Sequence, residues 1–387
     1  MSSDMSAMLS TISAFALPAL LAMAGIAAVY QLLTLAAGIR HLLRTPPATP
    51  AELPAISILK PLRGLDHGLN EALESFASQD YPEFEMIFAV ADPNDPAIPV
   101  IRKVMAAHPE RPSRLLVIEA DLPNRKVAKL SAMEAVARNP VLLISDADIL
   151  APPGYLKAVA AALDAPGVGL VTAIYRARAK SFAGRWEALG ISTDFSPSAL
   201  VGRLIGVSEF ALGSTIAMRK DLLDSIGGCR AVGEYIADDY HLGRLVRERD
   251  LRIALLREPV ETALSAESWG DVWQHQLRWA RTIRASRPDG YAGLPVTSAS
   301  LWALLLLLTP YWLWGAALLA LRMIAGSWLA RVVLHDRSSL AMLLLQPFRD
   351  LWAFAIWLWG FSGRTVEWRG QRLVLNRRGV IVTEPLN

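Results

Sequence analysis

Two carboxylates stand two residues apart directly after an apolar run in the middle of the chain. Asp146 and Asp148 follow Val141–Ile144, which has the length and composition of a buried strand. Residues two apart in an extended chain point to the same side, so both carboxylates face one way. Paired carboxylates hold Mg²⁺ or Mn²⁺, and such an ion bridges a diphosphate and neutralises it as it departs. Because Asp-x-Asp also arises by chance, a loop-capping role is the alternative.

A second acidic pair, Asp238 and Asp239, opens a predicted helix that runs to about Arg249. Adjacent residues point about 100° apart on a helix, so one carboxylate can face a site while the other caps the helix. The carboxylate that faces the site is a candidate general base for an acceptor hydroxyl. His241 is a second candidate base, and simple complementation of the helix dipole is the structural alternative.

Positive side chains occur where a bound phosphate would need them. Lys60 and Arg63 follow the first predicted strand, with Gly64 beside them. Lys126 and Lys129 share one face near the start of a helix, where cations oppose the helix dipole unless an anion binds between them. Both pairs are therefore candidates for phosphate binding, and a solvated basic surface is the alternative for each.

Short apolar runs alternate with helical patterns through the middle of the chain. This alternation predicts βαβ units and an α/β domain with a mostly parallel central sheet, in which ligands lie beyond the carboxyl ends of the strands. Asp92 is at such an end, where its carboxylate can accept hydrogen bonds from a base or ribose, or simply form a turn. We expect strands at Ile56–Leu59, Met86–Val90, Leu115–Ile118, Val141–Ile144 and Leu170–Ile174, and helices at Leu69–Gln79 (with Asn70 as a possible N-cap), Ile98–Ala107, Val127–Arg138 and Tyr155–Leu163.

A basic and aromatic helix is predicted over Trp269–Arg284. Arg278, Arg281 and Arg284 are three residues apart and form a stripe, and Trp279 adds a flat apolar surface beside it. Such a helix suits a sugar or lipid at a membrane, and it is also typical of a helix that only lies among the headgroups.

The composition indicates a membrane protein and excludes several other classes. Of 387 residues, 53% are hydrophobic and 19% charged, and the net charge is only +3, unlike the dense basic runs of nucleic-acid binders. Mean hydropathy is +0.32, with the apolar excess near both ends. The single cysteine, Cys229, excludes an intrachain disulfide or a cysteine-based zinc site.

The apolar ends predict about three membrane crossings. Ala14–Ile39 carries no charge and is long enough to span, and the basic residues that follow it place the next domain in the cytoplasm. A second span is predicted over Leu301–Leu321, with Pro310 inside it, and the interrupted apolar runs beyond Ile324 supply the third crossing or an interfacial piece. These features divide the chain into an anchor (1–44), a Pro-rich linker (45–54), an α/β domain (55–290), a membrane or interfacial region (291–363) and a basic cytoplasmic tail (364–387).

Taken together, these motifs resemble the ceramide glucosyltransferase family of membrane glycosyltransferases, whose members have the GT-A fold. The resemblance runs from about residue 56 to residue 284 and is nearest to bacterial members, including the hopanoid-biosynthesis glycosyltransferases. The family signature is three Asp positions followed by (Gln/Arg)-x-x-Arg-Trp. The matching residues here are Asp92, Asp146, Asp239, Arg278 and Trp279, and His275 stands where Gln or Arg is usual.

The resemblance implies a role for each matched residue. Asp92 would lie near the uridine, Asp146 and Asp148 would bind Mg²⁺ or Mn²⁺, and Asp239 would be the catalytic base. The implied fold is a GT-A-like nucleotide-sugar-binding domain with about three transmembrane helices. The implied reaction is inverting transfer of glucose or N-acetylglucosamine from a UDP-sugar to a hydroxyl of a membrane lipid, ceramide or a hopanoid polyol, at the cytoplasmic face of the inner membrane. The nucleotide of the donor would be the only nucleic-acid component bound, and the segment 182–204 is a candidate acceptor-side surface.

Two other functions remain open on the sequence alone. A processive polysaccharide synthase shares the motifs, but it needs more membrane helices after the transferase domain to form a channel. A non-catalytic scaffold derived from a transferase would not need Asp146, Asp148 and Asp239, all of which are retained.

Overall fold

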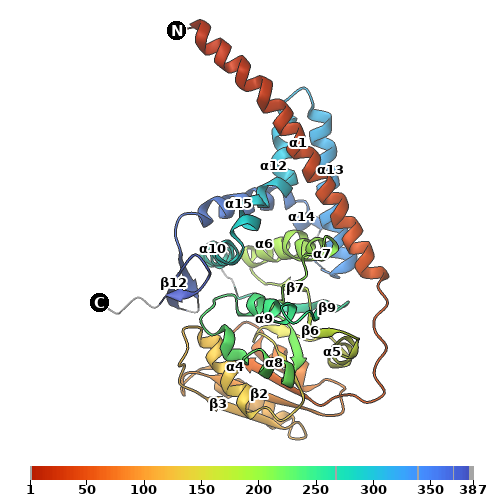
Figure 1. Ribbon diagram of the computed structural model, residues 1–387, viewed down its shortest axis with the longest axis vertical. Coiled ribbons are helices and arrows are strands. Elements are labelled where there is room, and N and C mark those ends of the chain that lie inside the picture. Colours follow the sequence, from red (N-terminus) through yellow and green to blue (C-terminus); the bar gives the residue numbers. More distant parts are fainter. Residues whose placement is uncertain (1, 266–267, 338–339, 369, 383–387) are drawn as a thin grey trace, which may run out of the picture.

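The computed structural model describes residues 2–265, 268–337, 340–368 and 370–382. It has three parts stacked along its long axis (Figure 1). A bundle of apolar helices stands at one end and a β-sheet domain at the other, and helices that run crosswise lie between them.

A seven-stranded sheet forms the centre of the transferase domain, in the order β3-β2-β1-β4-β8-β6-β9. Neighbouring strands run parallel except β8, which is antiparallel to both β4 and β6. The predicted α/β fold with a mostly parallel sheet is confirmed, and all five predicted strands are present, whereas β8 and β9 were not anticipated. The bounds are β1 Ile56–Pro61, β2 Phe84–Val90, β3 Ser113–Val117, β4 Val141–Ile144, β6 Val168–Thr172, β8 Ile216–Arg219 and β9 Arg252–Leu255.

Helices cover both faces of this sheet because its strands carry apolar side chains on each side. Phe88 and Ile87 are adjacent on β2, both fully buried, and belong to separate cores on the two faces. The predicted N-cap Asn70 is wrong, since α2 begins after Gly68, a glycine in the left-handed conformation. The bounds are α2 Leu69–Ala77, α3 Ala97–Ala107, α4 Arg125–Val136, α5 Tyr155–Asp164, α8 Lys220–Ser225 and α9 Asp238–Arg247.

A second, three-stranded sheet lies beside the end of β4. It has the order β5-β10-β7, formed by Ile149–Leu150, Val260–Ala263 and Tyr175–Arg178. Because β5 starts directly after Asp148, this sheet fixes the path of the chain just beyond the Asp-x-Asp motif.

The structure contains three helical segments long and apolar enough to cross a membrane, within the described residues. They are Ala16–Leu43 in α1 (Ser2–Leu43), Pro288–Leu307 and Trp312–Val333. The predicted number of three is therefore met, but the single span predicted over Leu301–Leu321 is wrong. Helix α12 (Ala299–Leu307) ends before Pro310, and α13 (Trp312–Trp328) begins after it.

The turn around Pro310 reverses the chain, so that α12 and α13 pack against each other beside α1 (Figure 1). Proline has no N–H to continue a helix, and the Thr309 hydroxyl accepts a hydrogen bond from the Tyr311 N–H at 3.1 Å. Gly315 permits the close approach, because a Cβ there would lie 2.7 Å from the Ala303 carbonyl oxygen.

Four helices run crosswise between this bundle and the sheet: α6 Phe182–Gly190, α7 Ser196–Leu204, α10 Trp269–Ser286 and α15 Gln346–Gly360 (Figure 1). Indole rings join three of them, since Trp186 of α6, Trp269 of α10 and Trp352 of α15 are in mutual contact with ring centroids 5.6 to 6.2 Å apart. Amphipathic rings gathered beside apolar helices are typical of a membrane–water boundary.

The basic tail is largely folded, which the sequence did not predict. Residues 365–382 form an antiparallel sheet of β11 Thr365–Trp368, β12 Gln371–Leu375 and β13 Ile381–Val382, and residues 383–387 lie outside the described part of the chain. The Ile381 N–H donates to the Glu234 carbonyl at 2.8 Å, and Ile236 packs against Val366 and Leu375. This sheet therefore braces the segment that leads into the acidic pair at 238–239.

Candidate active site

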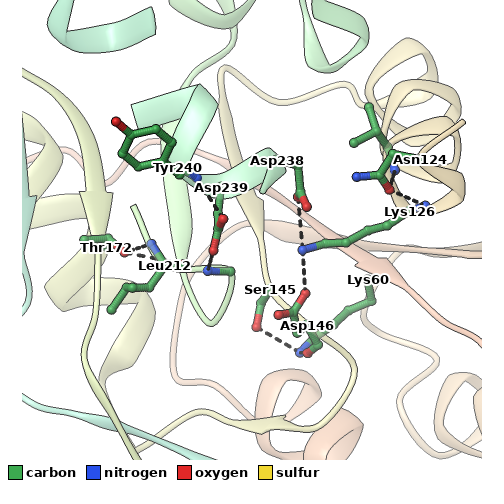
Figure 2. A network of polar contacts seen from close by, with 12 residues as sticks. Lys60, Asn124, Lys126, Ser145, Asp146, Thr172, Leu212, Asp238, Asp239 and Tyr240 are labelled. Atoms are coloured by element: carbon green, nitrogen blue, oxygen red, sulfur yellow. Dashed lines mark hydrogen bonds and ion pairs between the residues drawn. The ribbon is translucent and has the colours of Figure 1, made fainter. Parts of the chain in front are cut away.

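Lys126 lies at the centre of the polar network at the carboxyl edge of the sheet. Its ammonium is 2.8 Å from Asp146 Oδ1 and 3.1 Å from Asp238 Oδ2 (Figure 2). Asn124 positions it, because its side chain caps α4 by accepting hydrogen bonds from the Lys126 and Val127 N–H groups. Burial alone would lower the pKa of Lys126, but Asp146, Asp238 and Asp239 outweigh it and raise that pKa above its usual range.

Asp239 lies beside this network and reaches it through one glycine. Its carboxylate accepts hydrogen bonds from the Gly213 N–H at 2.9 Å and from the Tyr240 N–H at 2.7 Å, and Figure 2 shows Asp239 beside Tyr240. The Gly213 carbonyl accepts a hydrogen bond from the Asp146 N–H. Burial, and then the neighbouring Asp238, raise the pKa of Asp239 to about 6. Asp239 is partly exposed whereas Asp238 is buried, so Asp239 is the member of the pair that can take up a proton from a ligand.

The absence of a side chain at Gly213 lets the loop lie close against the acids. A Cβ there would lie 2.7 Å from Asp146 Oδ2 and 3.3 Å from the Lys126 ammonium. The loop is held by Thr172, whose hydroxyl accepts from the Leu212 N–H at 2.9 Å. The loop that joins the two acidic motifs therefore comes from between α7 and β8, a segment with no chemical motif of its own.

Asp148 is the second carboxylate available for a metal ion. Its Oδ2 accepts a hydrogen bond from the Thr262 hydroxyl at 2.6 Å, which fixes it against β10. Burial, and then the like charge of Asp146, raise the pKa of Asp148. No group of three His, Cys, Asp or Glu side chains forms a metal site within the described residues. Asp146 and Asp148 supply carboxylate oxygens, the ligand type that Mg²⁺ and Mn²⁺ prefer, and their joint binding of a metal ion stays a prediction.

A hollow of about 740 Å³ opens on the Asp148 side of these acids. Asp66, Gly68 and Ser265 are among the residues that line it. The lining residue Gly68 lies against Ala263, whose N–H donates to the Asp148 carbonyl at 3.0 Å, so the hollow is near the end of the Asp-x-Asp motif.

Lys60 occupies a different place from the one its sequence position suggested. It is fully buried over the ring of Phe76 and donates to the Ser145 hydroxyl at 3.1 Å and the Asp146 carbonyl at 2.9 Å (Figure 2). Burial lowers the pKa of Lys60 to about 7, against the opposing effect of Asp148 and Asp146. Lys60 therefore fixes the Asp-x-Asp loop, and its expected contact with a donor phosphate stays a prediction.

Asp92 and Arg63 lie at the same sheet edge without joining the Lys126 network. Asp92 is exposed and accepts a hydrogen bond from the Asn94 N–H at 2.8 Å, which is the turn geometry that the sequence left open. The buried carboxylate nearby is Asp95, which accepts from the Gly64 N–H at 3.0 Å and so fixes the loop that carries Arg63. The expected role of Asp92 near a nucleotide remains a prediction.

The basic helix α10 contacts the C-terminal sheet on one side and helix α6 of the crosswise layer on the other. The Arg278 guanidinium lies 5.9 Å from the ring centroid of Trp368, and Arg281 donates to the Thr365 carbonyl. His275 Nδ1 is 2.5 Å from Glu187 Oε1 of α6, and Trp279 is 4.6 Å from the His275 ring. The arginine stripe is thus engaged in part by protein groups.

Most of the chain matches a known family. Its sequence fits the profile of Glycosyl transferase family 21 over residues 19–381. The chain belongs to this family. It is 31% identical to ceramide glucosyltransferase 1 of Caenorhabditis elegans over 210 residues, which are 54% of this chain and 45% of that protein. It is 32% identical to a ceramide glucosyltransferase of Candida albicans over 115 residues, 26% of this chain and 21% of that one.

The family 21 chain spans about half the length of the first curated relatives that it matches. Among solved structures, it resembles a mannosyltransferase of Pyrobaculum calidifontis in complex with GDP-mannose and Mn²⁺. The TM-score is 0.52 at 18% identity, and the match covers 88% of this chain and 98% of that one. This likeness shows that the transferase domain has the GT-A-like fold.

Sequence reasoning missed three residues that shape the site of this family 21 protein. Gly213 links Asp146 to Asp239, Thr262 fixes Asp148, and Glu187 holds His275. Only the glycine carried a usable signal, since Leu-Gly-Ser-Thr before an apolar run is typical of a turn that leads into a strand.

Proposed function

We propose that this protein is an inverting glycosyltransferase that moves glucose or N-acetylglucosamine from a UDP-sugar to a hydroxyl of a membrane lipid, either ceramide or a hopanoid polyol. The observation that supports this most strongly is the position of Asp239. A carboxylate with a raised pKa is held, through Gly213, beside an Asp-x-Asp motif at the ligand-binding edge of a GT-A-like sheet.

In the proposed reaction, Asp239 acts on the acceptor and the other charged groups organise the donor end. The acceptor hydroxyl oxygen forms a bond to the anomeric carbon and its proton passes to the Asp239 carboxylate. The bond from that carbon to the diphosphate breaks, and the diphosphate leaves with the electron pair. Attack from the face opposite the leaving group inverts the anomeric configuration.

Asp146 and Asp148 would hold Mg²⁺ or Mn²⁺, and the ion when bound supplies positive charge to the departing diphosphate. Lys126 keeps Asp146 and Asp238 in place. Lys60 fixes the Asp146 carbonyl from below, so the motif is set before a donor arrives. Arg63, Asp92, Arg278 and Trp279 remain candidates for contacts to the UDP-sugar.

A lipid acceptor is supported by the crosswise helices that separate the sheet from the apolar bundle. The segment 182–204, proposed as the acceptor-side surface, forms α6, a π-helical turn at Ile191–Phe195 and α7. Its Phe195 packs on Trp279 of α10, with ring centroids 5.7 Å apart. We place the sheet domain on the cytoplasmic side of the inner membrane, since Arg40 lies in the last turn of the first span and Arg44 directly follows it. The names of the relatives, ceramide glucosyltransferases, support a lipid as the acceptor.

The test compares two Asp→Asn variants of the full-length protein in membranes. Each is incubated with lipid extract and radiolabelled UDP-glucose or UDP-N-acetylglucosamine, and the products are identified by mass spectrometry. We expect Asp239→Asn to lose activity by about 10³-fold or more, the upper part of the range of general-base effects. The control, Asp221→Asn, changes an exposed acid at the start of α8 and should remain active.

Each product has a distinct meaning. A lipid that carries one added sugar, with inverted configuration by NMR, supports the proposal. A polymer would instead indicate a processive synthase, and full activity of Asp239→Asn would show that the protein uses another base or none.

A further inference from the structure

A small pocket lined by arginines lies at the edge of the sheet, away from the acidic site. Its volume is about 100 Å³. It is formed where the end of α1, helix α7, the last turn of α9 and the edge strand β9 come together, and Figure 1 shows α1 ending on the same side as α7 and β9. The lining side chains include Ser208 and four arginines, Arg44, Arg203, Arg247 and Arg252.

The four arginines have no acidic partner within the described part of the chain. Three are held by backbone carbonyls: Arg203 donates to Ile253 at 2.7 Å, Arg247 to Leu251 at 2.8 Å, and Arg252 to Pro166. Arg203 Nη1 is buried and has no hydrogen-bond acceptor. A half-buried guanidinium with one buried N–H group that lacks an acceptor is costly to the fold unless an anion satisfies that group.

Electrostatics agree with this geometry. Burial, followed by the like charges of Arg44 and Arg247, lowers the pKa of Arg203 to about 10. The pocket is therefore a concentrated positive potential, and planar guanidinium groups match the oxygens of a phosphate.

The position of the pocket points to the source of that phosphate. Arg44 is the first residue after the candidate span Ala16–Leu43, so the pocket begins where the chain leaves the apolar bundle. Anionic lipid headgroups attract arginines that directly follow a membrane span. We propose that this pocket binds the phosphate group of an anionic membrane lipid, separately from the donor and acceptor sites.

The test measures lipid binding to the full-length protein in detergent by native mass spectrometry. The probes are phosphatidylglycerol, zwitterionic phosphatidylcholine and inorganic phosphate. We expect wild type to prefer phosphatidylglycerol, and the Kd to rise about fivefold for each arginine removed in Arg44→Gln and in Arg44→Gln/Arg247→Gln.

Arg40→Gln is the matched control, because Arg40 is an exposed arginine one turn earlier on α1 that does not line the pocket. An equal loss in Arg40→Gln would reduce the effect to general surface charge and overturn the proposal. Equal affinity for inorganic phosphate and phosphatidylglycerol would overturn the lipid assignment. A circular-dichroism spectrum and an elution profile unchanged from wild type establish that the variants are folded.

Discussion

Cations are placed in two opposite ways in this molecule. At the carboxyl edge of the sheet, Lys126 is 13% exposed and lies between Asp146 and Asp238. At the edge strand β9, Arg44, Arg203 and their neighbours meet without any described carboxylate. The first arrangement is complete without a ligand, whereas the second gains a counter-charge only when a ligand binds. We infer from this difference that the charged groups at the carboxyl edge are positioned before a ligand binds. The arginines of the pocket are placed to bind an anion.

The contrast between the Lys126 site and the arginine pocket is tested most directly by a substitution of Lys126. In Lys126→Met, Asp238 is left as a buried charge without a partner, so we expect the free energy of unfolding to fall by about 3–5 kcal/mol. Urea unfolding followed by tryptophan fluorescence in detergent measures this change. The control Lys103→Met removes an exposed lysine of α3 and should leave the unfolding midpoint unchanged.

A second substitution distinguishes charge from packing in that result. If the loss arises from the unpaired carboxylate, Lys126→Met/Asp238→Asn should recover much of the stability, because the buried charge is then removed as well. No recovery in the double variant would mean that Lys126 acts by filling space, and the contrast with the arginine pocket would lose its basis.

The pH dependence of activity sharpens the comparison on the acidic side. Asp239 must be ionised to accept a proton, and its pKa is raised to about 6, so activity should fall as the pH drops through that value. We expect kcat/KM to fall about tenfold per pH unit below it. In Asp238→Asn the midpoint should move to lower pH, because burial still raises the pKa of Asp239 but the like charge of Asp238 is gone. A midpoint that stays in place would show that another group limits the rate.

The sequence predicted those parts of the site whose signals are local. The apolar run Val141–Ile144 placed Asp146 and Asp148 at a strand end, and the alternation of strands and helices predicted the parallel sheet. The contacts that join these elements were not predictable in this way. Gly213 meets Asp146 and Asp239 from distant parts of the chain, and such partners depend on how the sheet is ordered in space.

Two further features were not visible in the sequence for the same reason. Hydropathy averaged over Leu301–Leu321 does not detect a reversal at Pro310, because both arms of the hairpin are apolar. The arginines after residue 364 hid the alternating apolar residues Val366, Leu373 and Leu375, which fold only because Ile236 offers them a surface. Mean hydropathy in the first case, and the high positive charge in the second, do not reveal which part of the chain each segment packs against.

A contact in the crosswise layer gives a smaller effect. His275 Nδ1 lies 2.5 Å from Glu187, which is 1% exposed, so His275→Ala leaves a buried acid without this partner. We expect a loss of about 1–3 kcal/mol in unfolding free energy, and a smaller loss for His275→Gln, whose amide can still donate to Glu187. Thermal unfolding of both variants in detergent measures the difference. Equal losses would show that the ring matters through its packing on Trp279.

The smallest change in stability is expected for Arg44→Gln, and the direction of that change tests whether Arg44 lacks a partner. Removing one cation from a group of like charges relieves repulsion, so Arg44→Gln should leave the Tm in detergent within about 2 °C of wild type, and no lower. Adding phosphatidylglycerol should then raise the Tm of wild type and of Arg40→Gln more than that of Arg44→Gln, because only the latter has lost part of the pocket. A clear drop in Tm for Arg44→Gln without added lipid would mean that this arginine already has a partner. The pocket would then resemble the Lys126 site instead of contrasting with it.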